Sequence, residues 1–355
     1  MSYFGNVMAT CPNLQGALDE MWMQPGQFPG ADERMPFAEW LNSPFNRRRI
    51  SYEITPGRGK VRTAEVVYQQ RHLESAARTN QPNPNCEATE KYGENISTYT
   101  LDTDVNIQFG QQIDLTDYEG SCTDNTVLFA RQVAMLIDVM DRRVATEQTN
   151  QSVGWTGGWG QSVTVNGSDQ FVINTLNAGT QNPAPFAWQQ LRNALDDSGF
   201  PGDVGIFGGQ TMRNYFQYLQ AGCCADYGID LGEAMAQWGY AFAYDKRMQA
   251  ALGSGGINEF MVVAPGALQP ITFSRAEGKA AMGGIWDSSS NYFYATVRSP
   301  RLGIVYDLSA KDPCGTLSMN LTYTGKVIGM PRDMFAVGDE YEGITYAAQG
   351  LVTNS

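Results

Sequence analysis

The strongest hydrophobic pattern in the chain lies in residues 123–148, TDNTVLFARQVAMLIDVMDRRVATEQ, which contain no glycine or proline. Apolar side chains recur there at the 3.6-residue spacing of one helix face, and Thr123 or Asp124 can cap its start. The stripe consists of Phe129, Val133, Leu136, Ile137, Met140 and Val144. The charged residues fall mostly off it: Arg131, Asp138, Asp141, Arg142 and Glu147. The pattern predicts one long helix with this stripe buried, and with Arg131 and Asp141 at least partly exposed to solvent or a neighbour.

Alternating apolar and polar positions precede the helix. Residues 51–70 predict two strands around the glycine-rich tip PGRGK, and residues 96–112 alternate again. Together, residues 51–112 predict a long two-stranded ribbon. Because an isolated ribbon is only marginally stable in water, it needs a partner surface. We therefore expect its tip to contact a neighbouring subunit through Pro56, Gly57, Arg58, Gly59 and Lys60.

Residues 1–50 predict an irregular arm that is rich in proline, glycine and large apolar side chains. Its aromatic residues are spaced too irregularly to share one amphipathic face. Such a segment has to lay its aromatic rings on another surface, either of its own domain or of a neighbour. Trp22, Phe28 and Trp40 are accordingly candidate contacts between subunits.

The second half of the chain predicts mixed helices and strands. Residues 186–199, FAWQQLRNALDDSG, predict a helix ended by Gly199, followed by a buried strand, DVGIFGG, and a second helix stopped by Gly222. Another helix is predicted over LGEAMAQWGYAFAYDKR, residues 231–247. Strands are predicted in NEFMVVAP, NYFYATVR, LGIVYDL, TLSMNLTYTGKVIGM and GITYAAQGLV. The expected class is α+β, with one long helix and several non-contiguous sheets.

The formal net charge of −13 argues against tight nucleic-acid binding, which needs a basic surface to neutralise phosphates. Residues 1–100 are almost balanced, with 10 Lys and Arg against 11 Asp and Glu, so the acidity lies in the rest of the chain. Arg47, Arg48 and Arg49 form the only basic run. A contact with DNA or an acidic neighbour and a solvated arm end are equally good interpretations of this run.

Most catalytic and metal-binding arrangements are missing from the sequence. The single histidine, His72, excludes histidine-rich metal sites, and no phosphate-binding loop or nucleophile elbow occurs. The stretch from Asp102 to Asn106 starts like a calcium loop but lacks its glycine and its final glutamate. Asp196 and Asp197 are adjacent on a predicted helix and point in different directions, so a solvated face explains them better than a pair of catalytic acids. We expect no cofactor, no metal and no catalytic residue.

Six scattered cysteines form no CxxC pair. The vicinal Cys223 and Cys224 are better explained as small residues beside a turn than as a redox or metal site. The first residues lack the pattern of a signal peptide, and no run of 18 apolar residues occurs. We expect synthesis in a cytoplasm, reduced thiols and no membrane partner.

The order of these elements resembles the HK97-like fold of the major capsid proteins of tailed bacteriophages. In that family an aromatic arm, a protruding ribbon called the E-loop and a long spine helix precede a compact axial domain, and the chain ends in the peripheral domain. The resemblance implies an arm at 1–50, an E-loop at 51–112, a peripheral domain at 113–166 and 314–355 with the spine helix at 123–148, and an axial domain at 167–313. It covers nearly the whole chain and rests on architecture, because the family has no short diagnostic motif.

The resemblance also implies a function. Subunits would assemble as pentamers and hexamers into an icosahedral or prolate capsid around double-stranded DNA, with portal, scaffolding and decoration proteins as partners and weak, non-specific contact to DNA. The chain would be part of the virion. Two features depart from parts of the family. The sequence starts directly with the arm and shows no charged helical scaffolding segment, so we expect a separate scaffolding protein or none. No motif identifies a cross-linking partner for Lys60 or Lys91.

Three alternatives stay open at this point. An encapsulin-type nanocompartment shell would share the fold and enclose protein cargo. A tail or decoration protein would lack the long helix. From a different class, a carbohydrate hydrolase that relies on two carboxylates needs no histidine and tolerates an acidic, aromatic-rich chain.

Overall fold

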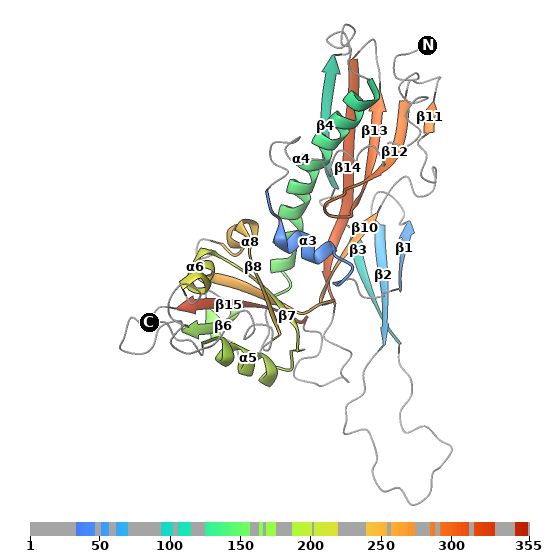
Figure 1. Cartoon of the computed structure of the whole chain (residues 1–355). Coiled ribbons are helices and arrows are strands. Elements are labelled where there is room, and N and C mark those ends of the chain that lie inside the picture. Colours follow the sequence, from blue (N-terminus) through green and yellow to red (C-terminus); the bar gives the residue numbers. More distant parts are fainter. Residues whose placement is uncertain are drawn as a thin grey trace, which may run out of the picture. The chain divides into compact units, whose positions relative to one another are not determined.

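The computed structural model describes sixteen segments of the chain, and every structural statement below refers to them (Figure 1). They are residues 33–46, 51–56, 62–69, 94–101, 106–114, 125–156, 163–165, 168–174, 187–200, 202–218, 239–253, 257–273, 285–287, 292–311, 316–330 and 345–353. The chain divides into two compact units. The first comprises Met1–Ser43, Leu101–Gln148 and Pro270–Lys326, and the second comprises Pro44–Thr100, Thr149–Gln269 and Val327–Ser355. Helices and strands are mixed in both, so the predicted α+β class is confirmed.

The first unit is built on a six-stranded sheet in the order β10-β14-β13-β12-β11, with β4 pairing β14 as well (Figure 1). The strands are β4 (Asn106–Asp114), β10 (Leu268–Phe273), β11 (Ile285–Asp287), β12 (Tyr292–Arg298), β13 (Val305–Lys311) and β14 (Thr316–Gly329). The pairs β11–β12, β12–β13, β13–β14 and β14–β4 are antiparallel. A sheet of this kind can be made from consecutive strands joined by short turns, as β12 and β13 are.

The long helix α4 (Asn125–Val153) supplies most of the core of the first unit. Five of the six predicted stripe residues are confirmed as fully buried: Val133, Leu136, Ile137, Met140 and Val144. The side chain of the sixth, Phe129, is outside what the structure describes. Alternate residues of the sheet join the same core, among them Tyr306, Leu308 and Ala310 of β13 and Met319, Leu321 and Tyr323 of β14. The side chains at every second position of the strands and those at 3.6-residue spacing on the helix therefore pack together in a single apolar layer.

Residues 33–42 are an ordered part of the first unit rather than an irregular arm. Helix α3 (Pro36–Asn42) starts with a proline, whose fixed φ suits a first helical turn. Met35 and Ala38 enter the core, and the amide nitrogen of Asn42 donates a 2.8 Å hydrogen bond to Gln148 Oε1 on α4. The expectation of an arm without regular structure is wrong for this segment, because its apolar residues find a surface within their own unit.

The hairpin predicted at 51–70 is confirmed. Strands β1 (Ser51–Pro56) and β2 (Arg62–Gln69) are antiparallel, with Pro56 opposite Arg62, and β3 (Glu94–Leu101) lies next to β2 in a three-stranded sheet. The predicted two-stranded ribbon to residue 112 is wrong beyond residue 101. Strand β4 instead pairs β14 from Asp114 opposite Thr316 to Asn106 opposite Thr324. Alternation marks a strand but does not identify its partner.

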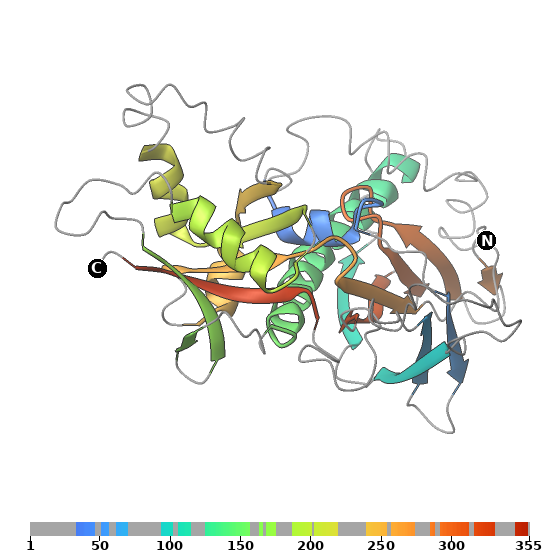
Figure 2. The ribbon, with the colours of Figure 1, turned by 90° about the horizontal axis from the view of Figure 1, so that it is seen from below.

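The second unit contains a sheet in the order β5-β6-β15-β9-β7-β8. Its strands are β5 (Val163–Val165), β6 (Ser168–Asn174), β7 (Val204–Gly208), β8 (Tyr240–Tyr244), β9 (Glu259–Val263) and β15 (Ala347–Thr353). The last strand, red in Figures 1 and 2, is parallel to β6 and antiparallel to β9. The predicted helix–strand–helix is confirmed as α5 (Ala187–Asp197), β7 and α6 (Gln210–Tyr218), with Gly199 following α5 at φ 72.

One prediction in this part of the chain, a helix over residues 231–247, differs from the structure where the chain is described; residues 231–238 lie outside the described residues. Residues 240–244, expected to continue a helix, form β8, which is parallel to β7. Gly239 precedes β8 at φ 70, a left-handed conformation that does not fit a helix, and only glycine fits there because a side chain would strike the carbonyl of Gly202. A short helix, α8 (Lys246–Ala251), follows, capped by Asp245, whose side chain accepts from the backbone nitrogens of Arg247 and Met248.

The domain boundaries at 113–166, 167–313 and 314–355, which the resemblance implies, stay a prediction. In the structure, β14 and β15 lie in different sheets. Strands β12 and β13 contribute residues to the core of α4. Strand patterns are similar in both sheets, so the sequence alone does not separate them. No helix among the described residues is long and apolar enough to cross a membrane.

Candidate functional site: a buried polar cluster on the long helix

Asp141 lies on α4 and is fully buried, so the prediction that it stays partly exposed is wrong. Its Oδ2 accepts a 2.7 Å hydrogen bond from the Ser299 hydroxyl, and its Oδ1 accepts a 2.5 Å bond from the Tyr306 hydroxyl. A buried carboxylate is tolerated when such donors replace water. One donor, Tyr306, lies on β13 and the other, Ser299, in the turn before it, about 160 residues later in the chain, so helix periodicity carries no information about them.

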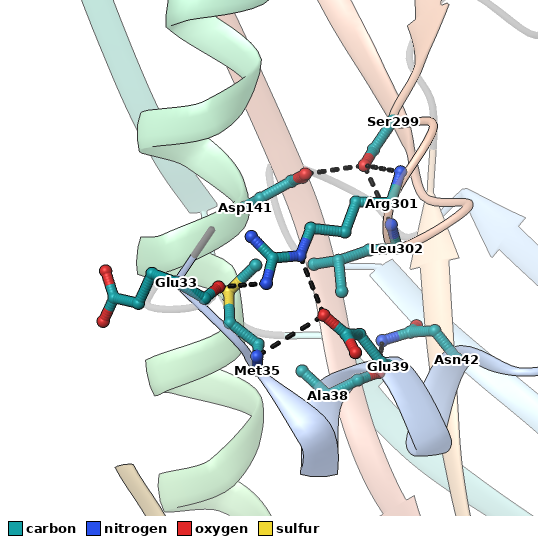
Figure 3. Close-up of polar contacts among 9 residues, drawn as sticks. All are labelled: Glu33, Met35, Ala38, Glu39, Asn42, Asp141, Ser299, Arg301 and Leu302. Atoms are coloured by element: carbon teal, nitrogen blue, oxygen red, sulfur yellow. Dashed lines mark hydrogen bonds and ion pairs between the residues drawn. The ribbon is translucent and has the colours of Figure 1, made fainter. Parts of the chain in front are cut away.

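Ser299 fixes the turn that joins β12 to β13. Its Oγ donates to Asp141 and accepts from the backbone nitrogens of Arg301 at 3.2 Å and Leu302 at 3.0 Å (Figure 3). Its own backbone nitrogen donates to the Ile304 carbonyl at 2.8 Å. One donated and two accepted bonds use the full capacity of a hydroxyl. The turn is therefore held in one geometry against the helix.

Arg301 connects this turn to the segment around α3. Its Nε donates a 2.8 Å bond to Glu39 Oε1, and another guanidinium nitrogen donates to the Glu33 carbonyl (Figure 3). Glu39 Oε1 also accepts from the Met35 backbone nitrogen at 3.4 Å. The side chain of Arg301 is 11% exposed, so this ion pair is only partly screened by water. A continuous polar chain thus runs from α4 through the β12–β13 turn to residues 33–39.

Burial raises the pKa of Asp141 from its ordinary value of 3.8 to about 7, although the bonds from Tyr306 and Ser299 and the charge of Arg301 favour the ionised form. The charge of Asp138, one turn earlier on α4, raises the pKa of Asp141 further. Asp138 is itself 5% exposed and pairs with Arg142 at 2.8 Å through Oδ2. Its Oδ1 has no hydrogen-bond partner among the described residues.

The hydrogen bonds of the cluster hold the β12–β13 turn against α4. Both oxygens of Asp141 are engaged, and the Ser299 hydroxyl has neither a free proton nor a free lone pair. A nucleophile and base would need an open position for a reacting atom. Among the described residues no group of three histidine, cysteine or acidic side chains could hold a metal ion.

The residues predicted to contact neighbours are only partly covered by the structure. Trp40 is half-buried on α3, with its ring stacked near Phe37 at 6.4 Å between centroids. Pro56 is the last residue of β1. The remaining candidates lie outside the described residues: Trp22, Phe28, Gly57, Arg58, Gly59, Lys60, Arg47, Arg48 and Arg49. His72 and the six cysteines lie outside them too.

The acidic pair on α5 is confirmed as a solvated face. Asp196 and Asp197 are both exposed, and Asp196 Oδ1 accepts a 2.8 Å bond from Arg192 Nε one turn earlier. The residues that sequence reasoning missed are Ser299, Arg301 and Tyr306. The one available signal was Asp141 itself, an acid that follows an apolar position, Met140, within the buried stretch of the helix.

Replacing Arg301 with glutamine should loosen residues 33–39 without unfolding the sheet. The variant loses the charged partner of Glu39 and the bond to the Glu33 carbonyl, which together stabilise the segment by about 1–3 kcal/mol. Proteolysis ahead of α3 should become faster by roughly tenfold, measured by mass spectrometry of the fragments. Lys311→Gln, at an exposed position at the end of β13, should cleave like the unmodified protein. Equal rates in both variants would contradict the role assigned to Arg301.

No family model matches this chain, and no curated protein matches it. Solved structures similar to it include chains of three capsids. The chain of the mature capsid of bacteriophage PhiM1 is 10% identical, with 82% of each chain covered and a TM-score of 0.43. A chain of the capsid of Ralstonia phage GP4 is 8% identical, and the match covers 84% of this chain and 85% of that one with a TM-score of 0.41. A chain of the capsid of an empty GTA particle is 12% identical, and the match covers 82% of this chain and 90% of that one with a TM-score of 0.39.

Proposed function

We propose that this chain is a capsid shell subunit of the HK97-like type, the major capsid protein of a tailed bacteriophage. The observation that carries the proposal is the set of elements in one chain. A 29-residue helix is backed by an antiparallel sheet, a mixed sheet forms a second unit, and a small sheet, β1–β3, pairs with neither larger sheet. We infer that this separate three-stranded sheet carries a contact with a neighbouring subunit, as a shell requires.

An exposed aromatic residue on a fixed turn supports the same proposal. Phe45 is 69% exposed, and the next residue, Asn46, is fully buried. The side chain of Asn46 accepts from Gly266 N at 2.8 Å and donates to the Leu268 carbonyl at 2.9 Å, while its carbonyl accepts from Gln269 Nε2 at 2.8 Å. The turn therefore keeps the apolar Phe45 ring exposed to water, which is unfavourable for an isolated subunit. A ring presented in this way suits a contact between subunits.

The finer parts of the proposal follow from the shell role. The subunits associate as pentamers and hexamers in an icosahedral or prolate capsid, with portal, scaffolding and decoration proteins as partners. The acidic chain repels packaged DNA and keeps it mobile, so DNA contact is weak and confined to basic positions such as Arg47, Arg48 and Arg49. The role is structural and not catalytic. Assembly takes place in the host cytoplasm. No observation favours a nanocompartment shell or a carbohydrate hydrolase instead.

Deleting residues 56–60 tests the part of the proposal that concerns the hairpin. The tip joins β1 to β2 and, in a shell, contacts a neighbour, so its loss removes area between subunits and opens no cavity within a subunit. Circular dichroism and urea unfolding of isolated subunits should stay close to those of the unmodified protein. Electron microscopy should show few or no closed particles.

Normal particles of unchanged stability from this deletion variant would contradict the hairpin's role as an assembly contact. Loss of the helical signal in isolated subunits would contradict it as well, because the tip would then belong to an internal core. The two measurements on the same preparation separate a folding defect from an assembly defect.

A further inference from the structure

The two ends of the parallel strand pair β7–β8 carry opposite charges. Because the strands are parallel, the residues that precede both strands gather at one end, and those that follow both gather at the other. Helix α5 precedes β7, whereas α6 follows β7 and α8 follows β8. The pair also lies at the edge of its sheet, since β8 is the last strand in the sheet order of the described residues.

The end that precedes the strands is acidic. Asp196 and Asp197 are the last two residues of α5, Asp203 immediately precedes β7, and all three side chains are exposed. Arg192 joins these positions, because it donates to Asp196 and also to the Gly202 carbonyl at 2.9 Å. One arginine beside three carboxylates leaves an excess of negative charge at this end.

The end that follows the strands is basic. Arg213 on α6 is exposed, and its guanidinium carbon lies 5.1 Å from the ring centre of Tyr244, the last residue of β8. At the start of α8, Lys246 is exposed and Arg247 is half-buried. The contact with the ring holds the Arg213 charge beside the end of β8, close to the two cations of α8.

The acids at the basic end are buried. Asp245 accepts from two backbone nitrogens of α8, and Glu259 is buried at the start of β9. An apolar side chain is exposed at the same end: Ile257 is 50% exposed, and its carbonyl accepts a 3.1 Å bond from the Thr211 backbone nitrogen of α6. The surface at this end therefore presents cations around an apolar side chain, a composition that suits a protein contact.

The two ends cannot neutralise each other within one subunit. The five residues of β8 alone span about 13 Å, and Asp203 and Lys246 lie beyond its two ends. Ion pairs need about 4 Å, and physiological salt screens exposed charges over about 8 Å. Among the described residues, Asp197, Asp203 and Lys246 form no ion pair. A second copy of the chain offers each end the opposite charge.

We propose that the acidic end of one subunit docks on the basic end of a second copy, so that the copies associate head to tail. Asp203 pairs with Lys246 of the next copy. Asp197 pairs with its Arg213, and its Ile257 is removed from water. A head-to-tail interface uses two different surfaces and generates rings when the rotation closes. The inference rests on the proposed shell function, for which it names two contacting surfaces.

Carbodiimide coupling, which joins a lysine amine directly to a carboxylate, tests the contact on the assembled full-length protein. Mass spectrometry should find peptides that link Lys246 to Asp203 or Asp197. The length of β8 puts these groups out of reach of each other within one copy, so each such link reports a contact between copies. Electron microscopy of the same preparation records whether particles form.

Charge reversals test the same contact through association, measured by sedimentation velocity at a series of protein concentrations. Asp197→Lys with Asp203→Lys should weaken association by at least about tenfold, and so should Arg213→Glu with Lys246→Glu, because each pair sets like charges against each other. Combining all four reversals exchanges the two ends and should restore association to within about threefold. Arg131→Glu with Lys311→Glu, at exposed positions of the first unit, is the matched control and should leave association unchanged.

Particles that form without a link from Lys246 to either aspartate would overturn the docking and leave the shell proposal standing. Links in a preparation that forms no particles would support the docking and contradict the shell proposal. The pairing of the two ends would be wrong if the double variants associate normally, or if the fourfold variant associates no better than they do. Links confined to a species of two copies would overturn the head-to-tail arrangement.

Discussion

Replacing Leu136 with aspartate should prevent folding of the first unit, whereas the same replacement at the adjacent Met135 should leave it folded. Leu136 is fully buried between α4 and the sheet, whereas Met135, about 100° around the helix from it, is 37% exposed. Loss of a buried leucine costs about 2–5 kcal/mol, and an unpaired buried carboxylate costs several more. The sum is comparable to the whole stability of an ordinary domain.

Far-ultraviolet circular dichroism and urea unfolding of the two variants measure this difference directly. Both variants add one negative charge and one aspartate to the same stretch of helix, so charge and helix propensity are matched. The Met135 variant should keep the helical signal and lose at most about 1 kcal/mol. Similar stability of the two variants would contradict the assignment of the helix faces.

Replacing Asp141 with asparagine should change how the free energy of unfolding depends on pH. The pKa of Asp141 is about 7 in the folded chain and near 3.8 when exposed, so between these values the folded state holds a proton that the unfolded state has released. The free energy of unfolding therefore falls as pH rises from about 4 to 7. The contribution of this one group is about 4 kcal/mol, from three pKa units at about 1.4 kcal/mol each.

The Asp141→Asn variant cannot ionise at this position, so the contribution of Asp141 to the pH dependence of its free energy of unfolding is absent. Near pH 4 it should be less stable than the unmodified protein by about 1 kcal/mol, because an amide reproduces the bonds from Ser299 and Tyr306 imperfectly. Above pH 7 it should be the more stable of the two. Urea unfolding at a series of pH values measures the difference, with Asp197→Asn, an exposed acid, as the control. A difference between variant and unmodified protein that stays constant with pH would contradict the burial of an ionisable group at Asp141.

The long helix and the helix–strand–helix could be predicted because their signals are local. In α4 the spacing of Val133, Leu136, Ile137 and Met140 is set by contacts with a single surface, and every one of them is buried. In the second unit Gly199 ends a helix at positive φ, and β7 is apolar along its whole length. Periodicity and stop signals suffice in such cases, since they act within one element.

Pairing between distant strands could not be predicted in the same way. Residues 106–112 alternate like residues 51–69, yet they belong to a different sheet, because the choice depends on Met319 and Leu321 of β14 more than 200 residues away. Tyr240 to Tyr244 contain only residues that a helix accepts, and the parallel neighbour β7 makes them a strand. Tertiary contacts override weak local preference at such positions.

The burial of Asp141 could not be predicted from the sequence either, because its partners lie far away in the chain. Helix periodicity places Asp141 off the main stripe, and an unpaired acid is expected in water. The structure buries it because Ser299 and Tyr306 provide two donors and Arg301 provides a nearby positive charge. Those partners become visible only when the β12–β13 hairpin packs on α4. The sequence therefore shows an acid at position 141 but does not show that it is buried and hydrogen-bonded.

Electron microscopy of the purified full-length protein, expressed alone and with a scaffolding protein, tests shell formation most directly. We predict closed particles, or sheets and tubes built from rings of five and six subunits, with each subunit contributing one rod of density for the 29-residue helix α4. A monodisperse monomer at high protein concentration, with residues 1–32 and 57–61 protected from protease, would contradict the proposal that this chain builds a capsid.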